Sequence, residues 1–253
     1  MLEWWQYFLL AVAGLTAGFI DAIAGGGGLI TVPALLWAGL PVQFALGTNK
    51  LQSSFGTTLA VVRYTRAGLI DWRSLRLAVV ITFIAAVLGV WSVHKLNNAL
   101  LSRIVPMLLV IVAIYTALNP GLGERPRSAR MNMAVFALIF GTTLGFYDGF
   151  FGPGAGSFWM LACVLALGQD LRSATGTTKA LNLTSNIASL IAFGFAGCLR
   201  WDVGVVMISG QLIGARFGSG LVVANGAKII RPIFITTALA LAASLLWKSF
   251  AGN

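Results

Sequence analysis

The chain contains the same pattern twice. The run Gly18-Phe19-Ile20-Asp21, followed by glycines 25–28, returns as Gly145-Phe146-Tyr147-Asp148, followed by the glycine-rich stretch 152–156. A second pair of blocks, 47–50 and 176–179, reads Gly-Thr-Asn-Lys and Gly-Thr-Thr-Lys. The repeating unit is roughly 125 residues long, which is far longer than the unit of a solenoid. The chain is therefore expected to fold from two similar halves.

The composition places both halves in a lipid bilayer. Hydrophobic residues make up 58% of the chain and charged residues 9%, and the mean hydropathy is +0.89. A chain of 253 residues with so few polar groups cannot cover a water-soluble globule. The formal charge of +10 comes from short basic clusters between apolar runs, as in membrane orientation signals. We expect an all-α polytopic membrane protein and no nucleic-acid partner.

Each half contains five apolar segments. They are 4–24, 29–40, 48–63, 75–93 and 100–118, then 131–150, 157–168, 177–195, 202–223 and 229–249. The second segment of each half would reach only about 18 Å as a helix, too short to cross a hydrocarbon core of about 30 Å. The expected domains are a first repeat at 1–118, a cytoplasmic linker at 119–130 and a second repeat at 131–253. Each repeat has either five full spans or three spans and a re-entrant hairpin.

The basic loops predict the orientation of the repeats. The loops 63–76 and 119–130 are the richest in arginine, so both should be cytoplasmic. In the second half, the counterpart of the first basic loop has only Arg200 against Asp202, whereas the following loop carries Lys228 and Arg231. Because basic and neutral loops change places between the halves, we expect inverted repeats, with both termini outside the cytoplasm.

The two Gly-Thr blocks supply the candidate substrate site. They are either ordinary loops after short tilted spans or breaks inside the protein, with new helices beginning near Thr48 and Thr177; we expect the breaks. Lysine beside free helix amides would then form an anion receptor, although each lysine could instead extend to the membrane interface. Polar residues recur downstream at helical spacing, so each helix presents one polar stripe. The candidate substrate-binding residues are Thr48, Asn49, Lys50, Ser53, Thr177, Thr178, Lys179 and Asn182.

The glycine runs are expected to open the short helices. Glycine permits backbone conformations and close approaches that other residues do not, so each run serves either an anion at a helix N-terminus or close helix packing. The candidate backbone positions are Gly25, Gly26, Gly27, Gly28, Gly47, Gly152, Gly154, Gly156 and Gly176.

Asp21 and Asp148 precede the glycine runs at equivalent positions. An aspartate at the bilayer centre costs about 2.5–3.5 kcal/mol on insertion scales, so it usually faces a cavity or a partner. Three roles are open: capping the glycine-rich turn, binding substrate or a proton, and pairing with an internal lysine. The two aspartates are the candidates for coupling transport to a proton or sodium ion.

No residue pattern indicates catalysis. The single histidine, His94, stands beside Lys95 without a nearby carboxylate, and the two cysteines, Cys163 and Cys198, are isolated. No metal-ligand spacing or nucleophile motif is present. We expect no enzymatic activity, no metal and no cofactor.

The repeated motifs also resemble the sulfite exporter TauE/SafE family of membrane proteins. The resemblance rests on residues 18–21, 24–28, Pro33 and 45–50 together with their second-half copies, and it spans nearly the whole chain. It implies a multi-pass permease of the bacterial inner membrane that moves small anions, especially sulfite, sulfonates or sulfoacetate. Alternating access is the expected mechanism, and a passive anion channel is the alternative. Pro153, Ala155 and Thr178 depart from Gly26, Gly28 and Asn49 of the first copy, which weakens any expectation that the halves act identically.

Overall fold

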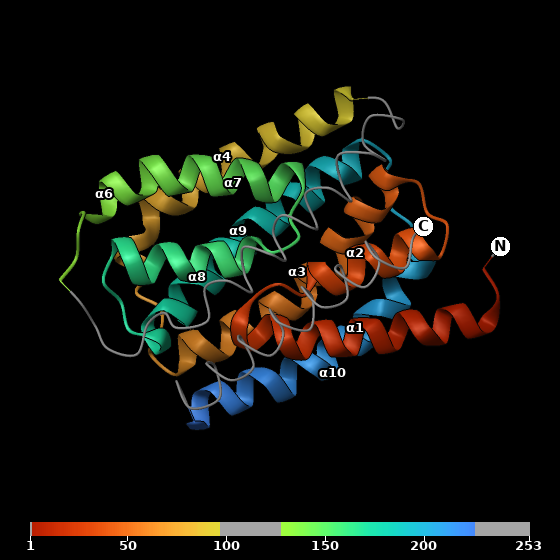
Figure 1. Ribbon diagram of the computed structural model, residues 1–253, viewed down its shortest axis with the longest axis horizontal. Coiled ribbons are helices and arrows are strands. Elements are labelled where there is room, and N and C mark those ends of the chain that lie inside the picture. Colours follow the sequence, from red (N-terminus) through yellow and green to blue (C-terminus); the bar gives the residue numbers. More distant parts are fainter. Residues whose placement is uncertain (1, 97–127, 226–253) are drawn as a thin grey trace, which may run out of the picture.

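A computed structural model describes residues 2–96 and 128–225. Within these ranges every regular element is helical (Figure 1). The segments at 100–118 and 229–249, and most of the linker, lie outside the described residues. The helices are α1 (Trp4–Ala24), α2 (Gly28–Trp37), α3 (Val42–Arg66), α4 (Trp72–Lys95), α6 (Met133–Phe136), α7 (Thr142–Phe150), α8 (Ala155–Ala166), α9 (Leu171–Phe195) and α10 (Trp201–Asn225), and a π-helical turn, Ala137–Gly141, joins α6 to α7.

Local sequence explains where the helices begin and end. Asp71 and Asp170 cap α4 and α9 by accepting hydrogen bonds from backbone N–H groups of the first turn. Glycines with positive φ terminate α2, α3, α8 and α9, because only glycine adopts this conformation without strain. They are Gly39, Gly68, Gly168 and Gly197, and each glycine of the first half has its counterpart 129 residues later.

The expected helix breaks at Gly47–Lys50 and Gly176–Lys179 are wrong. α3 and α9 run without interruption through both blocks. Gly47 and Gly176 instead allow each helix to pack against a loop, because an added Cβ would overlap the carbonyl oxygen of Cys198 or of Leu69, respectively. The polar content of these blocks therefore belongs to continuous helices.

The chain reverses at the glycine runs instead. α2 folds back along α1, and the rings of Trp5 and Trp37 meet with centroids 5.7 Å apart. α8 folds back in the same way after α7, and its last residue, Ala166, accepts hydrogen bonds from the backbone N–H groups of Arg130 and Met131. With ten and twelve residues, α2 and α8 would reach only about 15–18 Å. Each therefore forms the short arm of a helical hairpin.

The two hairpins point toward each other and meet at their tips. In Figure 1, α2 leads from the middle of the bundle toward one end, and α8 leads toward the opposite end. At the crossing, the backbones of Gly25 and Gly156 are so close that a Cβ on either would overlap the other. The tips are thus in backbone contact.

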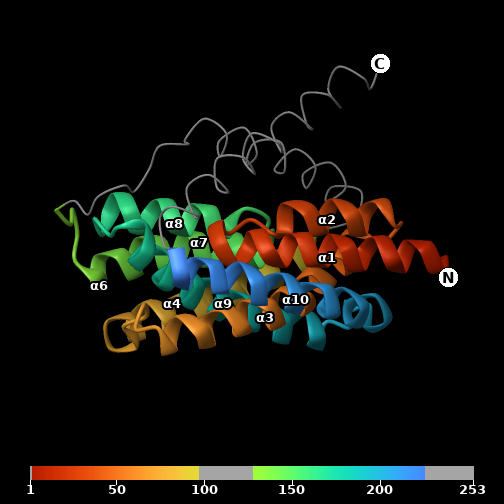
Figure 2. The ribbon, with the colours of Figure 1, turned by 90° about the horizontal axis from the view of Figure 1, so that it is seen from below.

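Helices of the two halves are interleaved around these tips. α1 packs along α10 and α7 packs along α4, while α3 and α9 contact each other between these pairs. Figure 2 shows α2 and α8 on one side of the bundle and α3, α4 and α9 on the other. α1 therefore pairs with the last described helix of the second half, and α7 pairs with α4, the last described helix of the first half.

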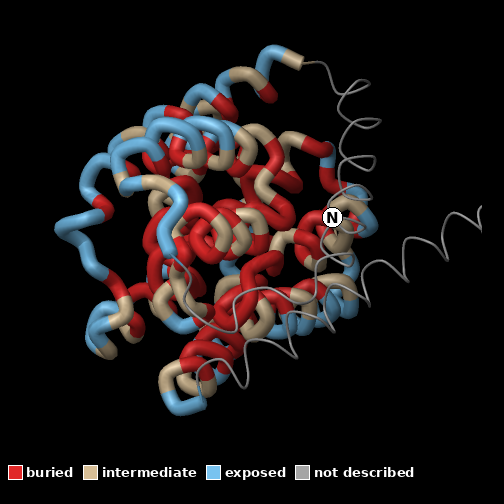
Figure 3. The backbone as a smooth tube through the Cα atoms, turned by 60° about the vertical axis from the view of Figure 1, so that its left-hand side comes forward, coloured by how far each residue is buried: buried red, intermediate tan, exposed pale blue. Residues whose placement is uncertain are grey.

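The bundle has the exposure pattern of a membrane protein. Four helices or helical stretches of the described chain are long and apolar enough to cross a bilayer: α1, α4, 133–150 and α10. Buried residues fill the middle of the bundle (Figure 3), and large apolar side chains face outward from the outer helices, where lipid can cover them. Examples are Phe8, Ile84, Leu88, Trp91, Leu138, Val205 and Phe217. The described residues therefore form an all-helical bundle with several candidate membrane spans, as expected of a polytopic membrane protein.

Candidate functional site

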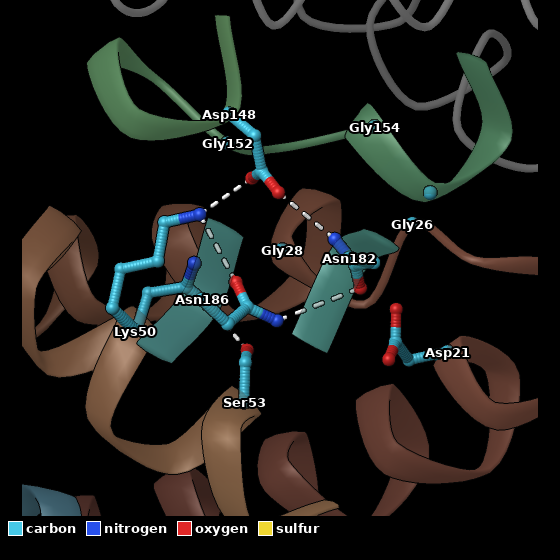
Figure 4. A pocket seen from close by; sticks show the side chains of 12 residues that line it. Asp21, Gly26, Gly28, Lys50, Ser53, Asp148, Gly152, Gly154, Asn182 and Asn186 are labelled. Carbon is cyan, nitrogen blue, oxygen red and sulfur yellow. Dashed lines mark hydrogen bonds and ion pairs between the residues drawn. The ribbon is translucent and has the colours of Figure 1, made fainter. Parts of the chain in front are cut away.

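A polar cavity of about 20 Å³ lies where the hairpin tips meet α3 and α9 (Figure 4). A space of this size holds about one water molecule. Its lining is polar or backbone throughout: Asp21, Gly26, Gly28, Asn49, Lys50, Ser53, Asp148, Gly152, Gly154, Gly156, Asn182 and Asn186.

Lys50 joins the first half to the second through Asp148. It is the ninth residue of α3, and its ammonium group donates to Asp148 Oδ1 at 2.5 Å and to Asn186 Oδ1 at 3.0 Å. Both members of the ion pair are about 1% exposed. Asp148 also accepts hydrogen bonds from Asn182 Nδ2 at 3.0 Å and from the Ser185 hydroxyl. These additional hydrogen bonds compensate for the loss of water around the two charges, which a buried ion pair requires.

Lys179 forms the reciprocal pair. It is the ninth residue of α9 and donates to Asp21 Oδ2 at 2.9 Å. Asp21 also accepts a longer hydrogen bond from Thr57 at 3.4 Å and one from the backbone N–H of Gly27 at 3.4 Å. Of the three open roles for the aspartates, pairing with an internal lysine is present in both halves, and Asp21 caps its glycine turn as well.

The two pairs are related by position but differ in their surroundings. Lys50 lines the cavity and has two acceptors. Lys179 lies beside the cavity, and Asp21 is its one hydrogen-bond partner among residues 2–96 and 128–225. Ser185, which donates to Asp148, corresponds to Gly56 in the first half, so the same bond cannot form there.

Amide side chains complete the polar network. Asn49 accepts from the hydroxyl of Thr31 at 2.5 Å and from Gln52 Nε2 at 3.1 Å. Across the cavity, Asn186 donates to Asn182 Oδ1 at 3.5 Å and to Thr57 at 3.4 Å. The first turn of α2 is thereby tied to α3, and α9 is tied to α3.

Two backbone N–H groups at the cavity add hydrogen-bond donors. Gly28 opens α2, and Gly156 is the second residue of α8; both line the cavity. Neither N–H donates to another residue of the described chain. The N-terminus of a helix favours negative charge, and residues at two helix starts line the same cavity as the ammonium group of Lys50. The glycine runs therefore open the short helices as expected.

The structure separates the predicted residues into two groups. Those that line the cavity are Asn49, Lys50, Ser53, Asn182, Asp21, Asp148, Gly26, Gly28, Gly152, Gly154 and Gly156. The remainder lie around it: Thr48, Thr177, Thr178, Lys179, Gly25, Gly27, Gly47 and Gly176.

Several of the residues outside the cavity contact neighbouring elements of the bundle. Thr48 accepts a hydrogen bond from the backbone N–H of Arg200 at 3.1 Å, which ties α3 to the loop before α10. The Thr178 hydroxyl faces the sulfur of Cys163 at 3.9 Å. Gly27 packs against Ala17 and Asp21 of α1. Since α3 and α9 begin well before the Gly-Thr blocks, Thr48 and Thr177 do not present free helix amides.

Asn186 is a cavity residue that the sequence analysis missed. It follows Asn182 by one helical turn on the polar stripe of α9 and corresponds to Thr57 of α3. Extending the stripe by one turn in both halves would have found it.

These features define a helical membrane protein with a buried charged site where two helical hairpins meet. The chain belongs to the sulfite exporter TauE/SafE family, whose model matches residues 10–245.

Relatives in several bacteria carry transporter names. The chain is 43% identical to "Probable membrane transporter protein YfcA" of Escherichia coli K12 over 241 residues, which cover 95% of this chain and 90% of the relative. It is 39% identical over 239 residues to a "Probable membrane transporter protein" of Haemophilus influenzae, covering 94% of each. A Bacillus subtilis protein with a similar name, YunE, is 21% identical over 243 residues, covering 85% of this chain and 88% of the relative. No solved structure matches the chain.

Proposed function

We propose that this protein is a secondary transporter of small anions that works by alternating access. The family description names sulfite export, and the bacterial relatives are named as membrane transporters. The proposed substrates are accordingly sulfur-containing anions such as sulfite, sulfonates or sulfoacetate.

The burial of Lys50 is the observation that carries this proposal. A lysine inside a bilayer costs about 2.5–3.5 kcal/mol on insertion scales, so such residues usually have a functional partner. Lys50 is 1% exposed and lines a cavity that Gly28 and Gly156, at the starts of α2 and α8, also line. An ammonium group and two helix amides together match the oxygens of a small oxyanion. Asn49, Ser53, Asn182 and Asn186 supply further hydrogen-bonding groups.

The small cavity supports alternating access. A space of about 20 Å³ cannot hold a sulfur oxyanion, so substrate binding requires the hairpin tips to separate. The tips are in backbone contact at Gly25 and Gly156, and the two ion pairs cross between the halves. We propose that this arrangement is the occluded state and that the halves rock around it.

Inverted repeats fit this mechanism. α1 and α7, α2 and α8, and α3 and α9 run in opposite directions in Figure 1. The reciprocal pairs Lys50–Asp148 and Lys179–Asp21 are what an inverted duplication would produce at its centre. We assign residues 1–118 and 131–253 to the two repeats and 119–130 to the linker.

The charge of the site supports coupling to a cation. The two lysines and two aspartates sum to zero when all four are ionised. A bound anion would leave the buried site negative, which is unfavourable in a medium of low dielectric constant. A co-transported proton or sodium ion would restore neutrality, with Asp21 and Asp148 as the groups that hold it.

The proposed location is the bacterial inner membrane, with the arginine-rich end in the cytoplasm. α3 ends at Arg66, while Arg73 and Arg172 stand in the first turns of α4 and α9. These three helix ends lie at the same end of the bundle in Figure 1, opposite the start of α1. The positive-inside rule then directs the start of α1 to the periplasm, and we propose the same side for the C-terminus.

Flux in proteoliposomes tests the proposal. Purified protein should take up radiolabelled sulfite or sulfoacetate with saturation, and an imposed proton or sodium gradient should drive accumulation. Lys50→Gln should abolish uptake, whereas Lys95→Gln, at the exposed end of α4, should not. Linear, gradient-independent flux would instead indicate a passive anion channel, and the absence of uptake for every sulfur anion tested would reject the proposed substrate class.

A further inference from the structure

A second site lies on the outer surface of the bundle, between α3, α9 and α10. It is a groove of about 580 Å³, separate from the polar cavity, and the two share no lining residue. Its walls are mainly apolar, and three arginines line it with them. The lining residues are Ser54, Phe55, Thr58, Leu59, Val62, Ile187, Leu190, Leu212, Arg63, Arg66 and Arg216.

The arginines carry charge that the described protein does not neutralise. No carboxylate of residues 2–96 or 128–225 forms an ion pair with Arg63, Arg66 or Arg216. Arg63 donates to the backbone carbonyl of Arg216 and to the Ser219 hydroxyl at 3.3 Å, so it is held in place by α10. Arg66 and Arg216 are exposed. The groove thus presents two accessible guanidinium groups beside a third that is fixed.

The arginines lie toward one end of an apolar trough. Arg63 and Arg66 are in the last turn of α3, while Phe55, Leu59 and Val62 lie one to three turns earlier on the same helix. A free inorganic anion would bind the arginines but would gain nothing from the apolar walls. A neutral acyl chain would contact the apolar walls but would leave the arginines without a counter-charge. A ligand with a negative head and an apolar tail satisfies both, since guanidinium groups bind phosphate in a bidentate manner and apolar walls favour burial of methylene groups.

We propose that this groove binds an anionic phospholipid. Its phosphate lies between Arg66 and Arg216, and one acyl chain follows α3 past Leu59 toward Phe55. Arg63, which its hydrogen bonds to α10 hold in place, lies beside the headgroup and restricts its position. A lipid here bridges α3, which carries Lys50, to α10, so its occupancy links the surrounding leaflet to the helix that bears the buried ion pair.

Native mass spectrometry of the purified full chain tests this site. Dioleoyl phosphatidylglycerol should be retained in preference to dioleoyl phosphatidylcholine. Arg66→Gln combined with Arg216→Gln should weaken phosphatidylglycerol retention by roughly fivefold for each charge removed. The matched control, Arg73→Gln with Arg76→Gln, removes the same charge from α4 outside the groove and should change retention much less. Leu59→Trp fills the trough without changing charge and should also weaken retention.

Three results would overturn the proposal. Equal losses in the groove and control variants would indicate diffuse surface electrostatics, and unchanged retention in the groove variant would place the lipid elsewhere. If inorganic phosphate displaces the lipid from the parent protein at equimolar concentration, the groove binds a free anion only. Should the double variant fail to fold, Arg66→Gln and Arg216→Gln are compared singly with Arg73→Gln.

Discussion

The ammonium group of Lys50 lies 2.5 Å from a carboxylate oxygen of Asp148, although the two residues are 98 positions apart and belong to different halves of the chain. Lys179 and Asp21 form a matching ion pair at 2.9 Å, in which the second half supplies the lysine and the first half supplies the aspartate. The charged centre of the protein is therefore built jointly by both halves, and neither half contains a complete pair.

Neutralising one member of the Lys50–Asp148 pair should destabilise the protein more than neutralising both. Asp148→Asn leaves a buried ammonium group unpaired, and breaking a buried pair in this way costs about 3–5 kcal/mol. Asp148→Asn with Lys50→Gln removes both charges and should recover most of that loss. Thermal unfolding in detergent measures the difference. Additive effects of the two single substitutions would mean that the pair contributes no coupling energy.

The contact between the hairpin tips predicts a graded response to alanine. Gly156→Ala would push a methyl group into the backbone of Gly25, and overpacking of this kind typically costs about 1–3 kcal/mol. Gly194→Ala, also in a helix, meets only the Leu199 side chain at 3.7 Å and is the matched control. Chemical or thermal denaturation should separate the two variants, and equal stability would contradict the close contact.

A second glycine pair separates backbone strain from packing. Gly25 and Gly39 both have positive φ, at 77° and 84°. Gly25 touches the opposing tip, whereas a Cβ on Gly39 has nothing within 4 Å among the described atoms. Gly25→Ala should therefore reduce transport and stability by more than Gly39→Ala, which measures the strain alone. If Gly39→Ala is as damaging, conformational strain rather than tip contact dominates.

The proposed orientation predicts which side of the membrane each loop faces. Single cysteines replacing Ser74 or Ser128 should resist an impermeant thiol reagent in intact cells, whereas a cysteine replacing Glu3 should react. All three positions are exposed in the structure. The background should lack Cys163 and Cys198, although burial already raises the pKa of the Cys198 thiol and slows its reaction. Efficient labelling from outside at position 74 or 128 would contradict the proposed orientation.

The sequence predicted the long helices better than the chain reversals. Segments 4–24 and 202–223 lie on α1 and α10 nearly residue for residue, because a long apolar run in a bilayer has few alternatives to a helix. The Gly-Thr blocks misled because polar residues in apolar sequence resemble a loop. Their partners come from other helices, as when Thr31 of α2 bonds Asn49 of α3, so local sequence carries no signal for them.

The pairing of the aspartates also lay beyond local sequence. Equivalent positions at Asp21 and Asp148 pointed to a shared role, and pairing with an internal lysine was one of three roles left open. The choice depends on how the hairpins cross, which brings Lys179 to within 2.9 Å of Asp21 across a separation of 158 residues. The duplication in the sequence indicates that a contact made by one aspartate should have a counterpart at the other. Only the fold identifies which lysine each aspartate contacts.

Anion binding by a neutral-pair variant is the most direct measurement of whether the cavity at Lys50 is the substrate site. Lys50→Gln with Asp148→Asn removes the charge without leaving an unpaired ion, so the protein should stay folded. Calorimetric titration with sulfite or sulfoacetate should show at least about a tenfold loss of affinity, as expected when a charge-assisted hydrogen bond is removed. Lys95→Gln, at the exposed end of α4, should bind like the parent protein. Parent-level affinity in the folded Lys50→Gln, Asp148→Asn variant would contradict the account.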